Sequence, residues 1–358
     1  MKYNLSNICN YAKGKIDVSE LDYRTYISTE NMLPNKGGIT EASSLPTTVQ
    51  TQAFIAGDVL VSNIRPYFKK IWFADFDGGC SNDVLVFRAK EDVSKRFLYY
   101  ILADDRFFDY SMATSKGTKM PRGDKSSIMQ YEVPEFSLDN QEKIAGLLEA
   151  LDKKIQLNSE INKNLEQQAF AIFNDMFADS IYGERTVGDI VTPNRGKCLL
   201  SKDAIPGNIP VVAGGLEPAT YHNQSNTVAP VLTISASGAN AGYVNLWNVP
   251  VWSSDSSFID SAMTKDVYFW YAMLKSRQSE IFDAQTGSAQ PHIYPKHIAG
   301  LPMGIISPNE IHQYTVLVST LFEKIGANKK ENIGLASIRD ALLPKLMSGE
   351  IDVSEIDI

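Results

Sequence analysis

The chain has 358 residues, of which 44% are hydrophobic and 21% charged, and its net charge is −8. This length and composition fit a globular protein of two or three domains, and no run of about 18 apolar residues occurs that would predict a membrane-spanning helix. The negative charge argues at first against a nucleic-acid partner. The N-terminal segment MKYNLSNICNYAKGK lacks an apolar core, so we expect no signal peptide. Three isolated cysteines offer no CxxC pair for zinc and favour a reducing compartment, so we expect a cytoplasmic protein.

The acidic residues are concentrated in two segments of the chain. Residues 1–136, the first block, carry 17 basic and 17 acidic side chains, and residues 181–307, the second block, carry 8 and 9. Residues 137–180 carry 4 basic against 8 acidic side chains, and residues 308–358 carry 5 against 8. Two nearly neutral blocks are left, each able to gather its cations on one face, while the acidic segments would suit a basic protein partner.

The first block is predicted to be a mixed α/β domain. A short helix or turn is expected near Asn4–Tyr11, and a turn-rich stretch near Leu33–Gly38. A single helix with buried aromatic residues is expected from Ser94 to Met112. Runs rich in valine and leucine predict strands at Asp58–Asn63, Ile71–Ala74 and Asp83–Arg88. The remaining segments are a polar loop at Ser115–Lys125 and an extended piece at Tyr131–Phe136.

One long helix is expected from Leu138 to about Asp179. This segment has no proline and, apart from Gly146, no glycine. At 1.5 Å per residue, such a helix would be about 60 Å long. A seam of residues recurs with alternating 4,3 spacing, which turns one face of the helix towards a partner helix. The seam consists of Ile144, Leu148, Leu151, Ile155, Asn158, Asn162, Leu165, Ala169, Ile172 and Met176.

A second long helix is expected from Glu310 to Met347. Adding 170 to each seam position gives a matching seam, including both asparagines. Its residues are Tyr314, Val318, Leu321, Ile325, Asn328, Asn332, Leu335, Arg339, Leu342 and Leu346. The repeated pattern predicts an intramolecular antiparallel coiled coil in which the first pair of asparagines faces the second pair. Such a polar layer fixes the register of the helices; alternatively, the asparagines mark a solvent-facing wobble in the seam.

The second block repeats the order of the first. The matched segments are Val187–Val191 with Leu5–Cys9, Pro230–Ser235 with Asp58–Asn63, Trp252–Ile259 with Cys80–Phe87, a helix at Val267–Ser279 with the helix from Phe97, and Gly287 and Pro291 with Gly117 and Pro121. A period of half the chain indicates duplication rather than a solenoid. The predicted fold class is therefore α+β: two similar mixed α/β domains, separated by two long antiparallel helices that form a coiled coil, with a pseudo-twofold internal repeat.

Motifs of catalysis are absent from the sequence. It contains no GxxxxGK[ST] phosphate loop, no GxGxxG after a strand, no GxSxG elbow and no HExxH. No Ser-His-Asp arrangement, Asn-Pro-Pro-aromatic methyltransferase motif or nuclease carboxylate-lysine set was found either. His292 and His297 could be imagined as metal ligands, but no carboxylate or cysteine cluster accompanies them, which favours hydrogen bonding in a loop. We expect no catalytic residue, no cofactor and no metal.

Several stretches resemble the specificity subunit of type I restriction-modification systems. They are VLVSNIRPYFKKIWFADFDGGCSNDVLVFRA, GTKMPRGDKSSIMQYEVPEF leading into NQEKIAGLLEALDKKI, VLTISASGANAGYVNLWNVPVWSSDSSFI, GSAQPHIYPKHIAGLPMG and IRDALLPKLMSGEI. The resemblance covers essentially the whole chain. Its most specific part is the duplicated order of domain and helix with the ending LLPKLMSGEI.

The resemblance implies how the chain is divided and what it does. Target recognition domains would occupy residues 1–136 and 181–307, each reading one half of a bipartite double-stranded DNA site. Residues 137–180 and 308–358 would be spacer helices that dock two methyltransferase (modification) subunits, and restriction (motor) subunits would join the same assembly. The resemblance also implies a chain without an active site of its own and without a membrane partner.

The resemblance directs attention to loops that could contact DNA, in which phosphate contacts position each domain and contacts with base edges give specificity. In the first block the candidates are Arg65, Tyr67, Lys69 and Lys70, and then Lys116, Lys119, Arg122 and Lys125. In the second block the candidates are polar: Ser235, Ser237, Asn240 and Asn245, and then Gln290, His292, Tyr294 and Lys296. Ordinary solvated charges, and turn-forming serine and asparagine, are the alternative interpretations.

Two other functions remain open at this point. A protein-assembly adaptor would grip two copies of one partner with its two similar domains and would not bind DNA. An enzyme would build its site from scattered residues. Binding to DNA should weaken steeply as salt rises, which distinguishes it from the adaptor.

Overall fold

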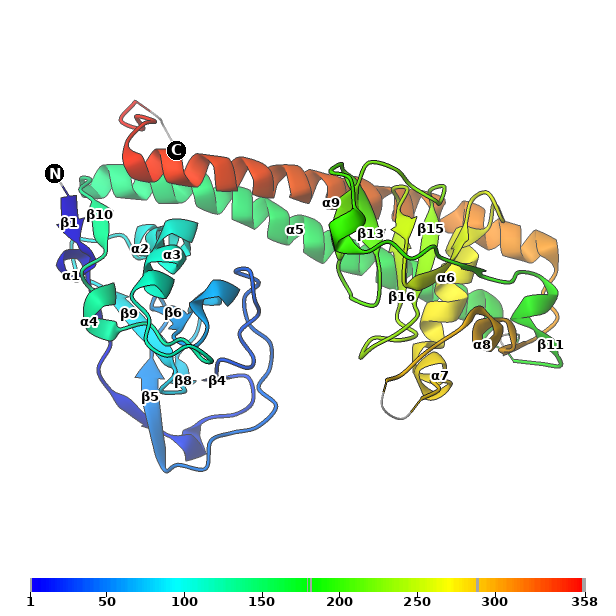
Figure 1. Ribbon diagram of the computed structural model, residues 1–358, viewed down its shortest axis with the longest axis horizontal. Coiled ribbons are helices and arrows are strands. Elements are labelled where there is room, and N and C mark those ends of the chain that lie inside the picture. Colours follow the sequence, from blue (N-terminus) through cyan, green and yellow to red (C-terminus); the bar gives the residue numbers. More distant parts are fainter. Residues whose placement is uncertain (1, 179, 181, 288–289, 356–358) are drawn as a thin grey trace. The chain divides into compact units, whose positions relative to one another are not determined.

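The computed structural model describes residues 2–178, 180, 182–287 and 290–355 (Figure 1). The chain forms two units: unit 1 comprises residues 1–155 and 334–358, and unit 2 comprises residues 156–333. The two long helices are α5 (Leu138–Phe177) and α9 (Pro308–Ser348), so each unit contains one half of each helix. Among the described residues, no helix combines the length and apolar character that crossing a membrane requires.

The globular part of unit 1 contains two four-stranded sheets and a strand pair among its described residues. The first sheet has the antiparallel order β2 (Cys9–Tyr11), β9 (Val84–Ala89), β6 (Val59–Ser62), β7 (Ile71–Phe73). The second has the order β3 (Lys15–Asp17), β5 (Gln50–Phe54), β8 (Gly78–Cys80), β4 (Tyr26–Ile27). β1 (Lys2–Asn4) pairs with β10 (Glu132–Pro134). The helices are α1 (Leu5–Ile8), α2 (Lys95–Ala103), α3 (Asp105–Ala113) and α4 (Lys125–Ile128), with short 3-10 turns at Val18–Glu20 and Pro66–Phe68.

Unit 2 repeats this organisation. Its four-stranded sheet has the antiparallel order β12 (Asn194–Arg195), β18 (Ser256–Asp260), β15 (Val231–Ser235), β16 (Val244–Trp247). A second sheet has the order β14 (Thr220–His222), β13 (Ile209–Val212), β17 (Trp252–Ser253), and β11 (Arg185–Thr186) pairs with β19 (Pro302–Met303). The helices are α6 (Val267–Ser276), α7 (Gln278–Asp283) and α8 (Pro295–Ala299), with 3-10 turns at Val187–Asp189 and Ser201–Asp203. The matching strand order of the two antiparallel four-stranded sheets confirms the predicted pair of similar mixed α/β domains, whereas the second sheet has four described strands in unit 1 and three in unit 2.

Two of the predicted helices are each divided in the structure. The segment Ser94–Met112 forms α2 and α3, because Asp104 between them is extended, with φ −64° and ψ 135°. The Asp104 carboxylate accepts a hydrogen bond from the backbone N–H of Arg106 and so caps the start of α3. Aspartate favours this capping position over the interior of a continuous helix. The helix predicted to reach Ser279 ends at Ser276, and α7 follows it.

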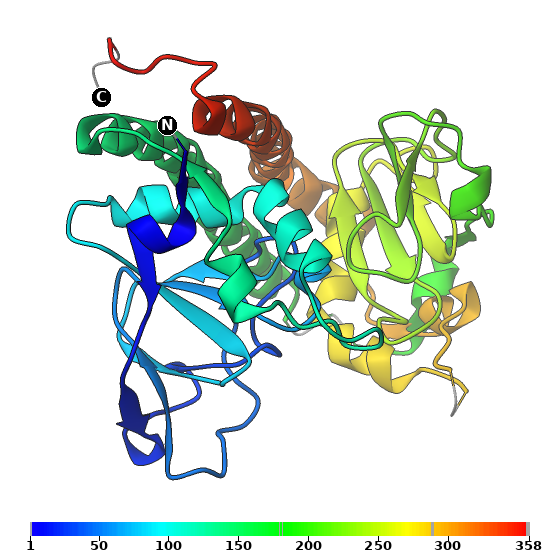
Figure 2. The same cartoon turned by 60° about the vertical axis from the view of Figure 1, so that its left-hand side comes forward.

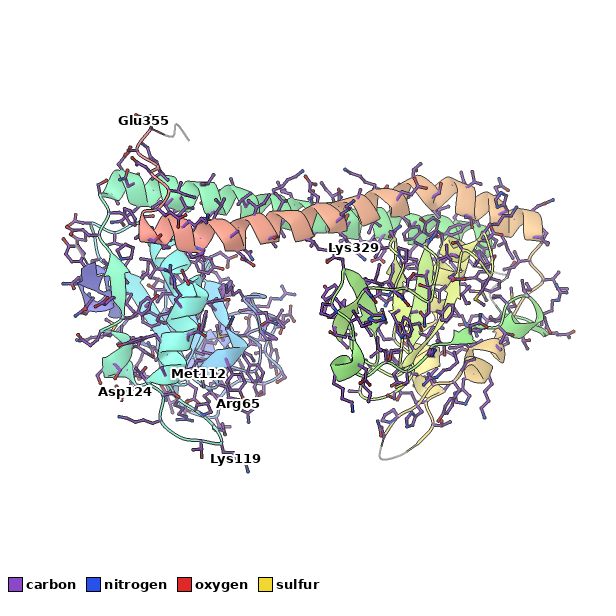
Figure 3. The ribbon with its side chains drawn as sticks, turned by 45° about the horizontal axis from the view of Figure 1, so that its top comes forward. Arg65, Met112, Lys119, Asp124, Lys329 and Glu355 are labelled. Atoms are coloured by element: carbon purple, nitrogen blue, oxygen red, sulfur yellow. The ribbon has the colours of Figure 1, made fainter. Side chains whose placement is uncertain are left out.

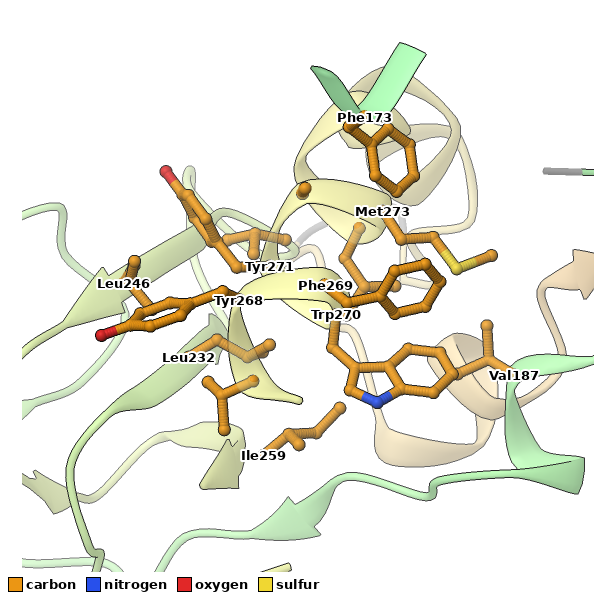
Figure 4. Close-up of a cluster of buried hydrophobic side chains, with 14 of the residues drawn as sticks. Phe173, Val187, Leu232, Leu246, Ile259, Tyr268, Phe269, Trp270, Tyr271 and Met273 are labelled. Carbon is orange, nitrogen blue, oxygen red and sulfur yellow. The ribbon is translucent and has the colours of Figure 1, made fainter. Parts of the chain in front are cut away.

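Helix α6 is the centre of the unit 2 core (Figure 4). Every residue from Val267 to Leu274 is buried, as expected for a helix that is apolar on all sides. On one side the ring of Phe269 packs on Phe173 of α5 and Tyr314 of α9, with centroids 5.8 and 6.2 Å away. On another side lie sheet residues such as Leu232. The sheet of unit 2 is thus joined to its halves of the long helices through α6.

The long helices lie side by side and antiparallel (Figure 2). In unit 1 the beginning of α5, with Ile144 and Leu148, shares a core with Leu346 near the end of α9. In unit 2 the hydroxyl of Tyr314, near the beginning of α9, donates to the Ala169 carbonyl late in α5 at 3.1 Å. All residues of both predicted seams are buried or partly buried. The predicted antiparallel coiled coil is therefore confirmed.

The asparagines of the seam form a symmetric polar layer. The amide of Asn158 donates to Oδ1 of Asn332 at 2.9 Å, and the amide of Asn328 donates to Oδ1 of Asn162 at 2.9 Å. Asn328 is the repeat equivalent of Asn158, and Asn332 is that of Asn162, each 170 residues later. The two hydrogen bonds are therefore equivalent, with the roles of α5 and α9 exchanged. Asn158 and Asn328 are only 2% and 1% exposed, so the solvent-facing interpretation of these residues is wrong.

Candidate nucleic-acid interface

In unit 1 the polar loop between α3 and α4 is closed by its own backbone. Lys116 and Arg122 form an antiparallel bridge, with backbone hydrogen bonds of 2.9 and 3.0 Å in the two directions. Gly117 has φ +92°, a left-handed conformation that glycine adopts without steric strain. The loop is therefore a compact turn with a defined shape.

This loop is docked on the segment that leaves strand β6. The contacts are an antiparallel bridge between Ile64 and Arg122, a hydrogen bond from the Arg65 N–H to the Pro121 carbonyl at 2.8 Å, and one from the Gly123 N–H to the Asn63 carbonyl at 3.3 Å. We call residues 63–65 and 116–123 the loop frame of unit 1. Figure 3 shows Arg65, Lys119 and Asp124 together at the end of unit 1 that faces away from its long helices.

The same frame recurs in unit 2, where it comprises the described residues 236–238, 286–287 and 290–293. Its contacts are bridges of His292 with Thr286 and with Ser237, a hydrogen bond from the Gly238 N–H to the Pro291 carbonyl at 3.1 Å, and one from the Ile293 N–H to the Ala236 carbonyl at 2.9 Å. The loop positions differ from those of unit 1 by 170 and the strand-end positions by 173. Gly287 has φ +95°, close to the value at Gly117. Backbone pairing thus builds two frames of one design from different side chains.

Cations surround the frame of unit 1, and two of them have carboxylate partners. Lys116 pairs with Asp124 at 2.6 Å, and Arg122 pairs with Asp83 at 3.2 Å. The hydrogen bond from Lys116, followed by those from Ser126 and Ser127, holds the pKa of Asp124 well below its ordinary value. Lys116 and Arg122 keep 81% and 55% of their side-chain surface exposed, so both still present positive charge to a ligand.

Lys119 and Lys125 extend the cationic surface of the frame. Both residues are exposed. In the described part of the chain neither forms an ion pair with a carboxylate. They are therefore available for phosphate contacts without first breaking an internal ion pair.

The second cationic loop, residues 65–70, is anchored by its lysines. Lys69 pairs with Asp105 at 2.8 Å, and Lys36 from another loop pairs with the same carboxylate at 2.9 Å. Partial burial raises the pKa of Asp105, but the hydrogen bonds from Lys69 and Lys36 outweigh it and hold the pKa below its ordinary value. The ammonium of Lys70 donates to the Thr29 carbonyl at 2.6 Å, and partial burial lowers its pKa. Lys69 and Lys70 thus stabilise the loop, whereas Tyr67, 49% exposed, points to its surface.

Backbone strain is concentrated in the same place. Loop 33–38 pairs with loop 65–70 through hydrogen bonds from the Asn35 N–H to the Phe68 carbonyl and from the Lys36 N–H to the Lys69 carbonyl, at 2.8 and 2.9 Å. Among the described residues, the non-glycine positions with positive φ are Asn35, Lys36, Arg65 and Lys69. All of them lie in these two paired loops, and such strain typically marks functional sites.

In unit 2 three candidates lie at or just after the end of strand β15, and one of them contacts Asp255. The Ser237 hydroxyl donates to the Asp255 carboxylate, which also pairs with Arg195 at 2.7 Å. Asp255 precedes β18 as Asp83 precedes β9, so an aspartate contacts the frame in each unit. Ser235 is buried at 4% exposure, and its hydroxyl has no hydrogen-bond partner among the described residues. The Asn240 amide lies 3.5 Å from the Gly214 carbonyl.

The loop side of the unit 2 frame presents stacked rings. The rings of His292 and Tyr294 are parallel within 17°, with centroids 6.0 Å apart, and Tyr294 is 41% exposed. Gln290 and Lys296 are exposed beside them. In contrast, Asn245 lies on β16, where its side-chain oxygen accepts a bond from the next backbone N–H. The structure thus gathers the other candidates at the frame and leaves Asn245 apart from it.

Two residues in or beside the frame, Asn63 of the frame and Lys36 of the neighbouring loop 33–38, were not anticipated from the sequence. Lys36 lies in a segment predicted only as a turn, and the Asn63 side-chain oxygen is buried without a partner among the described residues. The run LPNKGG signalled a turn, but nothing in it indicated which loop it would contact.

Residues 2–178, 180, 182–287 and 290–355 contain no cluster of three or more His, Cys, Asp or Glu able to hold a metal. Burial raises the pKa of the Cys9 and Cys80 thiols to about 12, so neither is a reactive nucleophile at neutral pH.

Comparison with known proteins connects this architecture to one family. Residues 1–167 match the family model described as the type I restriction modification DNA specificity domain. The specificity subunit of the type I restriction enzyme MjaIX from Methanocaldococcus jannaschii is 27% identical over 309 residues, which are 75% of this chain and 71% of the relative. The chain is thus similar to type I specificity subunits.

Two further comparisons extend this similarity to most of the chain. A putative type I specificity subunit from Mycoplasma genitalium is 25% identical over 291 residues, 76% of each chain. The crystal structure of a type I restriction-modification S subunit from M. genitalium has a TM-score of 0.59 and 19% sequence identity, and the match covers 97% of this chain and 96% of that one. This structural likeness concerns the fold and supports the arrangement of two α/β domains with two long helices.

Proposed function

We propose that this chain is the non-catalytic subunit that selects the DNA sequence on which a type I restriction-modification complex acts. Residues 1–136 and 181–307 would be target recognition domains, each reading one half of a bipartite site. Residues 137–180 and 308–358 would separate them and dock two modification subunits, through which restriction subunits join. The complex would act in the cytoplasm, where it meets the DNA that carries its recognition sites.

The observation that carries this proposal is the recurrence of the loop frame. Two frames of the same backbone design are what a protein needs to read two half-sites in the same way. Their side chains differ, with Arg65, Lys116 and Arg122 of unit 1 replaced by Gly238, Thr286 and His292 in unit 2. Because base edges are read by side chains, the two half-sites should differ in sequence.

The chemistry of each frame suits duplex DNA. In unit 1, Lys119, Lys125 and the exposed ends of Lys116 and Arg122 provide cations for phosphates, while Lys69 and Lys70 keep the neighbouring loop in place. In unit 2, amide, hydroxyl and imidazole groups suit base edges, and the candidates are Ser235, Ser237, Asn240, Gln290, His292, Tyr294 and Lys296. The near-neutral net charge of the first block is therefore compatible with DNA binding, since Lys116, Lys119, Arg122 and Lys125 lie together on the exposed surface of its frame.

Exchange of one block tests the proposal. The full chain is co-expressed with the modification subunits encoded beside it, and methylated adenines are mapped in the host DNA. Replacing residues 181–307 with the corresponding block of another specificity subunit should change one half of the methylated site and leave the other half unchanged. The reciprocal exchange of residues 1–136 is the matched control and should change the other half.

An unchanged methylation pattern after either exchange would contradict sequence recognition by that block. The adaptor alternative predicts that the purified full chain binds no duplex DNA even at low salt. DNA recognition instead predicts binding that weakens as salt rises, because phosphate contacts release counterions.

A further inference from the structure

We propose that Arg65 is the residue that reads a guanine in the half-site recognised by unit 1. This inference rests on the proposed function and assigns a base-contacting residue within it. It also predicts that unit 2 reads no base from the equivalent position, which is Gly238.

The first step of the argument is the backbone of Arg65. Its φ of 50° and ψ of 65° lie in the left-handed region, where the Cβ of an L-residue is crowded. It also precedes Pro66, which favours extended conformations at the preceding residue. Such a residue persists only where its surroundings enforce the conformation, and here the Pro121 carbonyl accepts its N–H at 2.8 Å.

Unit 2 shows how the same turn is made without strain. Gly238 occupies the equivalent position, donates the equivalent hydrogen bond to Pro291, and has φ +82°. A Cβ built on Gly238 would meet no atom within 4 Å, so open space surrounds the position. Glycine therefore satisfies the frame in unit 2, and the turn itself does not explain an arginine in unit 1.

The side chain of Arg65 has no evident structural task. Its Nε is buried and lacks a hydrogen-bond partner among the described residues. Neighbouring cations differ, because Arg122 pairs with Asp83 and Lys69 pairs with Asp105. Among the described residues no carboxylate forms an ion pair with Arg65. An arginine held in a strained backbone without an internal partner points to a ligand outside the chain.

The chemistry of the guanidinium identifies that ligand. Arginine offers a rigid fork of N–H donors, and guanine presents O6 and N7 side by side as acceptors in the major groove, which makes this pair the commonest specific contact with a base. The enforced backbone fixes the direction of the Cα–Cβ bond, and the planar guanidinium fork loses little conformational freedom for each hydrogen bond that it forms on binding. Lys119 and Arg122 on the paired loop provide cations for the flanking phosphates.

The test uses the full chain assembled with its modification subunits and a duplex that carries the methylated site mapped for the wild type. Each guanine of the unit 1 half-site is replaced in turn by 7-deazaguanine, which lacks the N7 acceptor. We expect wild-type affinity to fall about tenfold at one of these positions. The Arg65→Gly and Arg65→Lys variants should bind the mapped duplex more weakly and should no longer distinguish 7-deazaguanine from guanine there.

Two further measurements separate base reading from a structural role. The melting temperature of Arg65→Gly should equal or exceed that of the wild type, because glycine relieves the strain. Lys119→Gly in the same frame is the matched control, and it should weaken binding to all duplexes alike while keeping the response to 7-deazaguanine.

Three results would overturn the assignment of Arg65. They are an Arg65→Gly or Arg65→Lys complex that keeps the wild-type response to 7-deazaguanine, an Arg65→Gly variant that melts below the wild type, and a unit 1 half-site without guanine. In each case wild-type binding to the mapped site would leave the proposed function intact. Failure of the wild-type complex to prefer the mapped site would instead remove the proposed function itself.

Discussion

Because the two long helices would separate the two recognition domains, the two half-sites should be separated by a gap of base pairs that neither domain reads. Lengthening both helices should lengthen this gap. The chain passes from unit 1 to unit 2 between Ile155 and Gln156 and returns between Ile333 and Gly334, inside α5 and α9. A seven-residue insertion at each of these places extends each helix by about 10 Å. With a rise of about 3.4 Å per base pair, the gap should grow by up to about 3 base pairs.

The structure specifies where the insertions belong and how long they must be. The hydrogen bond between Asn158 and Asn332 shows that the two insertion points lie opposite each other on the paired helices. Seven residues keep the seam in phase because its pattern repeats every 3.5 residues, whereas a five-residue insertion rotates the seam by about 150° away from its partner. Five-residue insertions at both places are therefore the matched control, and they should weaken pairing of the helices.

The assay is the mapping of methylated adenines in cells that express the lengthened chain with its modification subunits. We expect the same two half-sites with a longer gap between them. A complex that still methylates its site with an unchanged gap would refute the idea that the helices set the spacing. Loss of assembly in both insertions, measured by co-purification, would show that helix pairing does not tolerate lengthening and would equally count against a simple spacer.

Three further predictions concern stability. Asn328→Ala should lower the free energy of unfolding by about 1–3 kcal/mol in urea titrations, because the side-chain oxygen of Asn162 loses its donor. The double variant Asn162→Ala, Asn328→Ala should cost no more than the single variant if the two residues are coupled. Full additivity of the two single changes would contradict the hydrogen bond. Trp270→Ala should cost about 3–5 kcal/mol, since this side chain is 1% exposed, and a smaller loss would mean that the core collapses around the cavity. The lowered pKa of Asp105 stabilises the fold above the unfolded pKa of about 4, and this contribution is lost as pH falls through the folded value. The difference in melting temperature between wild type and Asp105→Asn should therefore shrink below about pH 4, and a constant difference would argue against the lysine pair.

The long helices and the repeat could be predicted because their signals are periodic. A seam of alternating 4,3 spacing is a property of one segment, and its recurrence 170 residues later identifies the partner without any knowledge of the fold. The strands β6, β7 and β9 were also predicted, since short apolar runs bounded by turn signals leave few alternatives. The strand β2 was missed, because its segment Asn4–Tyr11 was expected to form only a short helix or turn. The polar layer followed from the same seam once the helices were paired antiparallel.

The features that the sequence did not reveal depend on contacts between distant segments. Lys69 and Lys116 were predicted as DNA contacts, and both have carboxylate partners whose identity depends on the path of the chain. The break at Asp104 was missed because an aspartate in an otherwise helical run gives no sign that its carboxylate will cap a new helix. The strain at Arg65 became visible only when its backbone was compared with that of Gly238.

A frame closed by main-chain hydrogen bonds has a consequence for how such proteins diversify. Because the contacts between residues 63–65 and 116–123 use N–H and C=O groups, side chains at these positions can change while the turn keeps its shape. Under the proposed function, mutation then alters the preferred bases one position at a time while the domain that contacts them stays folded. Two copies of the frame in one polypeptide double this freedom, since either half can acquire a new preference while the other keeps the old one.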